Sequence, residues 1–230
     1  MRDFLSGSLF FGGVATLVFY ELGLLIKKRF RLAILNPLLL ASIGVILFLR
    51  LVGVEYTSYN EGAKYISYLL TPATVALAVP LYEQVELLRR NLAAVLSAIL
   101  AGTLTALCCV TLLCRAFSLE HALAVSFLPK SITTAIGMSL SQELGGVASL
   151  TVAAIAITGV VGAVCAEGLF KLLRIREPIA KGLALGTASH AIGTSRALEL
   201  GEVEGAMSSL SIAVAGLLTV VLAPLFVHLV

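Results

Sequence analysis

Residues 92–114 read LAAVLSAILAGTLTALCCVTLLC, and none of these side chains is charged. A helix that crosses the roughly 30 Å hydrocarbon core of a bilayer needs about 20 consecutive apolar residues, so this stretch alone is long enough to cross. Two more uncharged stretches, 147–166 and 207–227, meet the same requirement. All three are continuous apolar runs without alternation, which predicts membrane-crossing helices rather than the strands of a membrane β-barrel.

The composition of the whole chain agrees with this interpretation. Of the 230 residues, 59% are hydrophobic and only 13% are charged, whereas about a quarter of the residues in a soluble domain are charged. Shorter uncharged runs at 4–20 and 32–49 reach the length of a crossing helix once their flanking residues are included. We therefore expect an all-α integral membrane protein, a multi-span helical bundle that forms a single transmembrane domain over residues 1–230.

The basic residues predict which side of the membrane each loop faces, because Lys and Arg are enriched in short cytoplasmic loops. Three basic clusters, at 27–31, 89–90 and 171–181, are expected on the cytoplasmic side. The loop 53–62 has acidic residues but no Lys or Arg, and is expected outside. The net charge of +3 is small and confined to loops, which argues against binding of nucleic acid.

Two segments combine glycine with polar side chains in a way that a lipid-exposed helix would not tolerate. Residues 122–144 contain Pro129 followed by the sequence KSITT, and residues 180–204 contain several glycines around His190 and Arg196. Irregular backbone at membrane depth survives only where it faces protein or a water-filled cavity. Both segments are therefore predicted to be broken helices, and the sequence leaves open whether each crosses fully or is re-entrant.

An internal repeat is indicated at an offset of 57 residues, between units 65–115 and 122–172. Chance matching between two segments rich in Ala and Leu is the competing explanation. Pseudo-symmetric, inverted repeats with broken helices at corresponding positions are typical of secondary transporters, and the matches include a proline before each polar kink. The matching pairs include Pro72 with Pro129, Gly102 with Gly159 and Cys108 with Cys165.

The candidate binding residues come from three polar stretches. A lysine at the centre of a membrane helix costs about 3 kcal/mol on insertion scales, so Lys130 needs water or a partner unless it snorkels to an interface. The planar guanidinium of Arg196 suits a carboxylate, unless nearby glutamates simply neutralise it. Pro72 and Pro80 are expected to unwind the helix near two threonines, although a simple proline kink is the alternative. The predicted substrate-binding residues are Thr71, Thr74, Lys130, Ser131, Thr133, Thr134, Ser189, His190, Thr194, Ser195 and Arg196.

No catalytic residue, metal site or cofactor is predicted. The chain contains no HExxH or GxSxG motif and no acidic residue paired with His190 in the sequence. We therefore expect that the protein is not an enzyme.

Three strings carry a resemblance to a known family: TPATVALAVPLYEQ at 71–84, LPKSITT at 128–134 and TASHAIGTSRALELGEVEGAMSSL at 187–210. They are specific in combination, and over nearly its whole length the chain resembles the LrgB/CidB family of antiholin-like, YohK-type membrane proteins. One departure is Ala135, because family members usually carry a second proline after the double threonine.

The resemblance implies a multi-pass protein of the bacterial inner membrane and two competing functions. One is transport of small monocarboxylates, such as pyruvate or glycolate, by alternating access. The other is regulation of murein hydrolase export and autolysis beside a small, holin-like LrgA/CidA membrane protein. We favour transport, because basic and hydroxyl groups at two broken segments need a polar ligand. The resemblance also implies a homodimer, and the sequence leaves the substrate and any coupling ion open.

Overall fold

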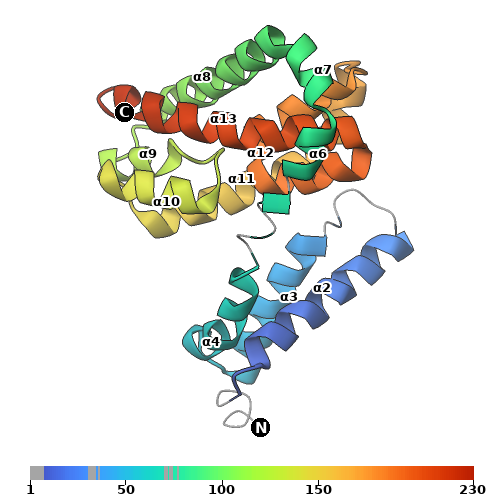
Figure 1. Cartoon of the computed structure of the whole chain (residues 1–230). Coiled ribbons are helices and arrows are strands. Elements are labelled where there is room, and N and C mark those ends of the chain that lie inside the picture. The colour runs from blue at the N-terminus through green and yellow to red at the C-terminus, as the bar shows by residue number, and fades with distance from the viewer. Residues whose placement is uncertain (1–7, 31–34, 36, 70–71, 73–74, 77) are drawn as a thin grey trace. The chain divides into compact units, whose positions relative to one another are not determined.

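The computed structural model describes the chain except for residues 1–7, 31–34, 36, 70–71, 73–74 and 77. In the described part all regular secondary structure is helical, and the chain divides into two compact units, Met1–Ala76 and Leu77–Val230 (Figure 1). Thr71 and Thr74, two of the predicted binding residues, lie outside the described residues.

The first unit packs three helices, α2 (Phe11–Phe30), α3 (Pro37–Val52) and α4 (Tyr56–Ser67). Phe11 and Val45 belong to its buried apolar cluster. Gly12 lies directly against the backbone of Tyr59, where a side chain would not fit. Close to this contact, Thr16 Oγ1 and Tyr59 Oη form a hydrogen bond of 2.7 Å. The two shorter apolar runs of the sequence thus lie partly in α2 and α3, whose crossing of the membrane stays a prediction.

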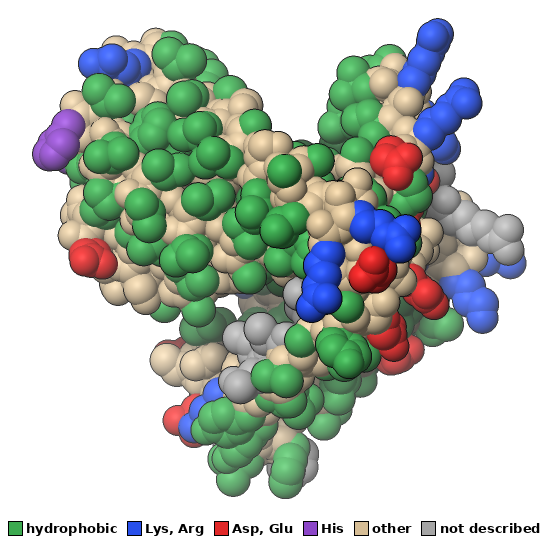
Figure 2. Space-filling view, turned by 45° about the horizontal axis from the view of Figure 1, so that its top comes forward, with side chains coloured by type: hydrophobic (Ala, Val, Ile, Leu, Met, Phe, Trp, Pro, Cys, Tyr) green, Lys and Arg blue, Asp and Glu red, His purple; other side chains and the backbone are tan. Residues whose placement is uncertain are grey.

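Three long apolar helices frame the second unit: α8 (Leu92–Ala116), α11 (Ala148–Leu172) and α13 (Glu202–Val227). Among the described residues, these are the three helices long and apolar enough to cross a membrane, and they coincide with the three long uncharged runs. Their outer faces expose side chains such as Leu112 and Leu217, and hydrophobic side chains cover much of the surface in Figure 2. The predicted all-α membrane fold is confirmed.

The first broken segment is a hairpin of two short helices, α9 (His121–Phe127) and α10 (Thr134–Glu143). At about 1.5 Å per residue, neither helix could cross a bilayer alone. Cys114, near the end of α8, shares an apolar cluster with Ala124 of α9. Val147, directly before α11, donates a hydrogen bond of 2.7 Å to Ser126 Oγ of α9. The segment therefore enters and leaves at one end of the unit, and we call 121–143 the first hairpin.

The second broken segment, α12 (Pro178–Leu200), also turns back on itself. His190 has non-helical backbone angles, φ 43° and ψ −136°. After this break, Gly193 lies against the carbonyl of Leu185, which a continuous helix would hold well apart from it. Both limbs contact α13 at the same residue, because Gly186 approaches the Ser208 backbone and Thr194 bonds to the Ser208 hydroxyl. We call 178–200 the second hairpin, and both broken segments turn back on themselves within the second unit.

The two hairpins enter the second unit from opposite ends. Asn91, directly before α8, and Glu177, which follows α11, line the same cavity, so α8 and α11 run in opposite directions. The first hairpin follows α8 and the second follows α11 (Figure 1). A helix and its hairpin thus occur twice, with opposite orientation.

The bounds of these elements recur along the chain. The helices span 92–116 and 148–172, and the hairpins span 121–143 and 178–200, which is close to the 57-residue offset found in the sequence. The helices α8 and α11 are each 25 residues long. The recurrence pairs helix 92–116 with helix 148–172, as the units proposed from the sequence, 65–115 and 122–172, also do, and those units stay a prediction.

This topology predicts that the two ends of the second unit face opposite sides of the membrane. Phe117 follows α8 and Leu173 follows α11, and their side chains are 74% and 65% exposed. With the native cysteines replaced by alanine, Phe117→Cys should react with an impermeant maleimide from outside, and Leu173→Cys only after permeabilisation. Labelling of both positions from the same side would contradict the opposed hairpins.

Candidate functional site

A cavity of about 1050 Å³ lies where the two hairpins, α8 and α11 approach one another. Lys130 and Ser131 reach it from the turn of the first hairpin, and Ser189 reaches it from the turn of the second. Alanine, valine, leucine and isoleucine side chains form much of the wall. The polar residues along it are Asn91, Thr105, Cys109, Lys130, Ser131, Thr158, Glu177, Thr187 and Ser189.

Lys130 carries the positive charge nearest to the hairpin turns. Its Nζ donates a hydrogen bond of 3.2 Å to Ser131 Oγ. In the described part of the chain, no carboxylate forms an ion pair with it. An ammonium group that is partly buried and has one neutral partner keeps unused hydrogen-bonding capacity, since it has three donors. The site can therefore accept a small anion or water at this point.

Buried hydroxyl groups hold the first hairpin against α11 and so fix the position of Lys130. Thr151 Oγ1 of α11 lies within hydrogen-bonding distance of two groups of the hairpin, 2.9 Å from Ser126 O and 2.7 Å from Ser141 Oγ. These three side chains are almost fully buried. A buried polar network whose members are all bonded is rigid, because each loss would leave an unsatisfied group.

His190 marks the break of the second hairpin and lies behind the cavity wall. Its Nε2 is 3.0 Å from Ile155 O of α11, which is consistent with a ring N–H donating to that carbonyl. The imidazole is 97% buried, with Gly159 directly beside it. This geometry matches a positioning role for His190, which anchors the turn that presents Ser189.

Arg196 lies away from this cavity. It pairs with Glu167 of α11 and with Glu199 of its own hairpin limb. Because the second hairpin turns back at His190, Arg196 returns towards the end of α11 instead of continuing deeper into the unit. The structure thus brings Lys130, Ser131 and Ser189 together and places Arg196 in an ion-paired link between α11 and the second hairpin.

The remaining predicted binding residues that the structure describes lie outside the cavity. Thr133 is the residue before α10, and Thr134 is exposed. Thr194 Oγ1 bonds to Ser208 Oγ at 2.7 Å, and the exposed Ser195 donates to Ala191 O. None of these four lines the cavity.

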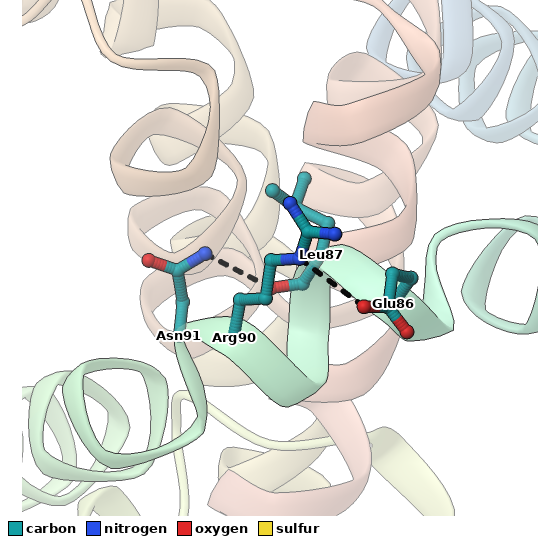
Figure 3. A network of polar contacts seen from close by, with 4 residues as sticks. All are labelled: Glu86, Leu87, Arg90 and Asn91. Atoms are coloured by element: carbon teal, nitrogen blue, oxygen red, sulfur yellow. Dashed lines mark hydrogen bonds and ion pairs between the residues drawn. The ribbon is translucent and has the colours of Figure 1, made fainter.

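One end of the cavity reaches the corner between α7 (Val85–Arg90) and α8, where Asn91 lines it. Figure 3 shows Asn91 Nδ2 donating to Leu87 O at 2.9 Å, beside the exposed pair of Arg90 with Glu86. Asn91 and Glu177 thus line the cavity at the end where the basic clusters 89–90 and 171–181 lie. If these clusters are cytoplasmic, as the sequence predicts, this end of the cavity lies towards the cytoplasmic side.

Sequence reasoning missed several cavity residues. Thr187 belongs to the polar stretch already singled out, and its buried Oγ1 has no hydrogen-bond partner in the described structure. The polar stretch could therefore have been used to predict Thr187 as a cavity residue. Thr105 and Thr158 lie in uninterrupted apolar runs, where a threonine that bonds its own helix looks the same in sequence as one that faces a cavity.

Comparison with known proteins identifies the family. The model of the LrgB-like family matches residues 16–229. This chain belongs to the LrgB-like family. Proteins named "Antiholin-like protein LrgB" from Bacillus mycoides, Bacillus cereus and Bacillus anthracis are 39% identical to it over 218 residues, which cover 94% of this chain and 95% of each relative. No solved structure matches the chain. The resemblance inferred from the three sequence strings is confirmed.

The contact between α11 and the turn of the second hairpin yields a test of the site's geometry. A side chain at Gly162 would overlap Ser189 Oγ, whereas one at Gly168, on the same helix, would meet nothing within 4 Å. Gly162→Ala should therefore destabilise the protein by about 1–3 kcal/mol, as overpacking does, and Ser189→Ala should partly restore it. Thermal unfolding in detergent would measure both, with Gly168→Ala as the matched control. A Gly162→Ala protein as stable as Gly168→Ala would show that the hairpin does not pack there.

Proposed function

We propose that this protein binds a small monocarboxylate at Lys130 and moves it across the bacterial inner membrane by alternating access. The observation that supports this proposal is the partly buried ammonium group of Lys130, without a carboxylate partner among the described residues, at the wall of a large cavity. A charge at that depth costs about 3 kcal/mol, which an anionic ligand would offset.

The surroundings of Lys130 suit a carboxylate with a second polar group. Ser131, Thr187 and Ser189 bring hydroxyl groups to the same cavity, and the apolar wall would accept a short carbon skeleton. Two opposed hairpins also suit alternating access, because in transporters broken helices from inverted repeats meet at the substrate. In this proposal Ser131 and Ser189 orient the ligand, and the link of Arg196 with Glu167 holds the second hairpin in place.

The names of the relatives favour a second candidate function. They are called antiholin-like, which supports regulation of murein hydrolase export and autolysis together with a small LrgA/CidA-like membrane protein. This support from the comparisons is stronger than any they give to transport, which rests on the cavity. The exposed apolar faces of α8, α11 and α13 could contact lipid, such a partner, or a second copy in a homodimer.

Lys130 variants test the transport proposal. Lys130→Ala should weaken carboxylate binding at least about tenfold, the loss expected for one charge-assisted hydrogen bond, and Lys130→Arg should retain part of it. Counterflow of radiolabelled pyruvate or glycolate in proteoliposomes measures the effect. The control is Arg115→Gln, which removes an exposed positive charge from the last turn of α8, outside the cavity. Wild-type counterflow by Lys130→Ala, or no counterflow by the wild type, would contradict the proposal.

Arg196 should behave differently from Lys130. Arg196→Ala leaves Glu167 without its partner across the two helices, so the thermal stability should fall. Its affinity for a carboxylate should change less than that of Lys130→Ala, because Arg196 does not line the cavity. Parallel measurement of melting temperature and binding affinity for the two variants separates the roles. If Arg196→Ala lost more carboxylate affinity than Lys130→Ala, Arg196 would have to be part of the binding site.

The regulator candidate has its own test. Co-expression with a small holin-like partner, followed by affinity purification, should yield a stable complex if the protein acts as an antiholin. A complex together with absent counterflow would favour the regulator over the transporter.

A further inference from the structure

We propose that the end of α11 and the start of the second hairpin form a binding site for the phosphate group of an anionic phospholipid. The site is a separate cavity of about 400 Å³, lined by Lys171, Arg174, Arg176 and Lys181 together with Glu167 and apolar residues. It shares no lining residue with the cavity at Lys130. The proposal therefore does not depend on the transport function.

The charge of this second cavity is positive and uncompensated. None of its four basic side chains forms an ion pair in the described part of the chain. The acidic residue that lines it, Glu167, is already engaged by Arg196. Glu177, the other acidic residue nearby in sequence, lines the larger cavity instead. Several Lys and Arg side chains around one pocket at a helix end are a known arrangement for lipid phosphates.

An arginine occupies the backbone position after α11 at which glycine is usually found, because the position requires a left-handed conformation. Helix α11 ends in a Schellman motif, in which Ile175 N bonds to Phe170 O at 2.8 Å and Arg174 N bonds to Lys171 O at 3.3 Å. Arg174 occupies the left-handed position of this motif, with φ 57°. That conformation costs a residue with a side chain roughly 1–2 kcal/mol. A charged side chain kept at a strained position indicates a use for the charge.

The apolar surroundings favour a lipid over free phosphate. Phe170, Ile175 and Leu200 line the cavity together with the basic groups. On the outside, Leu172 and Leu173 are 77% and 65% exposed at the same helix end. The end of a membrane-crossing helix lies at the level of the lipid headgroups. A phospholipid could thus place its phosphate among the basic groups and its acyl chains along these leucines.

The enrichment of basic residues in cytoplasmic loops is the competing explanation. This enrichment accounts for the number of positive charges in segment 171–181. It does not account for their positions, since basic residues at any exposed position of the loop would satisfy it equally. It does not require that four of them line one cavity or that one occupies a left-handed backbone position. The two explanations therefore differ in what a change of lipid headgroup should do.

Binding of defined lipids to the full-length protein in neutral detergent tests the site. Native mass spectrometry should detect tighter binding of phosphatidylglycerol than of phosphatidylcholine to the wild type. Loss of one basic contact should weaken phosphatidylglycerol binding about fivefold, and the double variant Arg174→Gly/Arg176→Gln roughly 30-fold. The matched control is Lys28→Gln/Arg29→Gln, which removes two exposed charges from α2 and should leave the preference unchanged.

Two further variants separate lipid binding from folding. Arg174→Gly should keep or raise the melting temperature in neutral detergent, because glycine adopts this backbone conformation without strain, yet it should weaken lipid binding. Arg174→Lys should retain most of the binding. Equal binding of the two lipids by the wild type, or unchanged binding by the double variant, would overturn the proposal. Displacement of phosphatidylglycerol by an equal concentration of inorganic phosphate would also overturn it, in favour of a site for free phosphate.

Discussion

The structure depends on one constraint, that backbone N–H and C=O groups inside a bilayer must find partners within the protein. Two hairpins break their helices at this depth, and each break is enclosed by other elements. In the first, the hydroxyls of Ser126, Ser141 and Thr151 connect the hairpin to α11. In the second, His190 contacts Ile155 O, and Thr194 bonds to Ser208. The long apolar helices α8, α11 and α13 surround these polar contacts and expose apolar side chains on their outer faces.

The same constraint explains how much could be predicted. The three uncharged runs identified the long helices because no other environment tolerates so much apolar surface. The polar stretches around Pro129 and His190 identified the broken segments because lipid excludes them. The sequence did not show that Arg196 lies beside Glu167, since that contact depends on the turn at His190 reversing the chain. The direction that the chain takes after a helix break depends on packing against other helices, and no local sequence pattern predicts it.

Some residues of the candidate site could be predicted from the sequence and others could not. Lys130 could be chosen from sequence because a lysine in an apolar segment is costly wherever it points. Thr105 and Thr158 could not, because a threonine within a helix can bond the carbonyl one turn earlier and needs no cavity. The LrgB-like relatives carry an antiholin-like name, while the transport proposal rests on the cavity at Lys130. The two descriptions concern one membrane protein in which the turns of both hairpins line the same cavity.

The glycines around the turn of the second hairpin determine how close this element lies to its neighbours. Gly102 of α8 and Gly159 and Gly162 of α11 lie against Thr187, His190 and Ser189. The hairpin tip is therefore bordered on two sides by bare backbone instead of interlocked side chains. The absence of side chains at these three positions lets the tip approach both helices closely. An added methyl group at any of these three glycines would therefore push the tip away from the helix that carries the glycine.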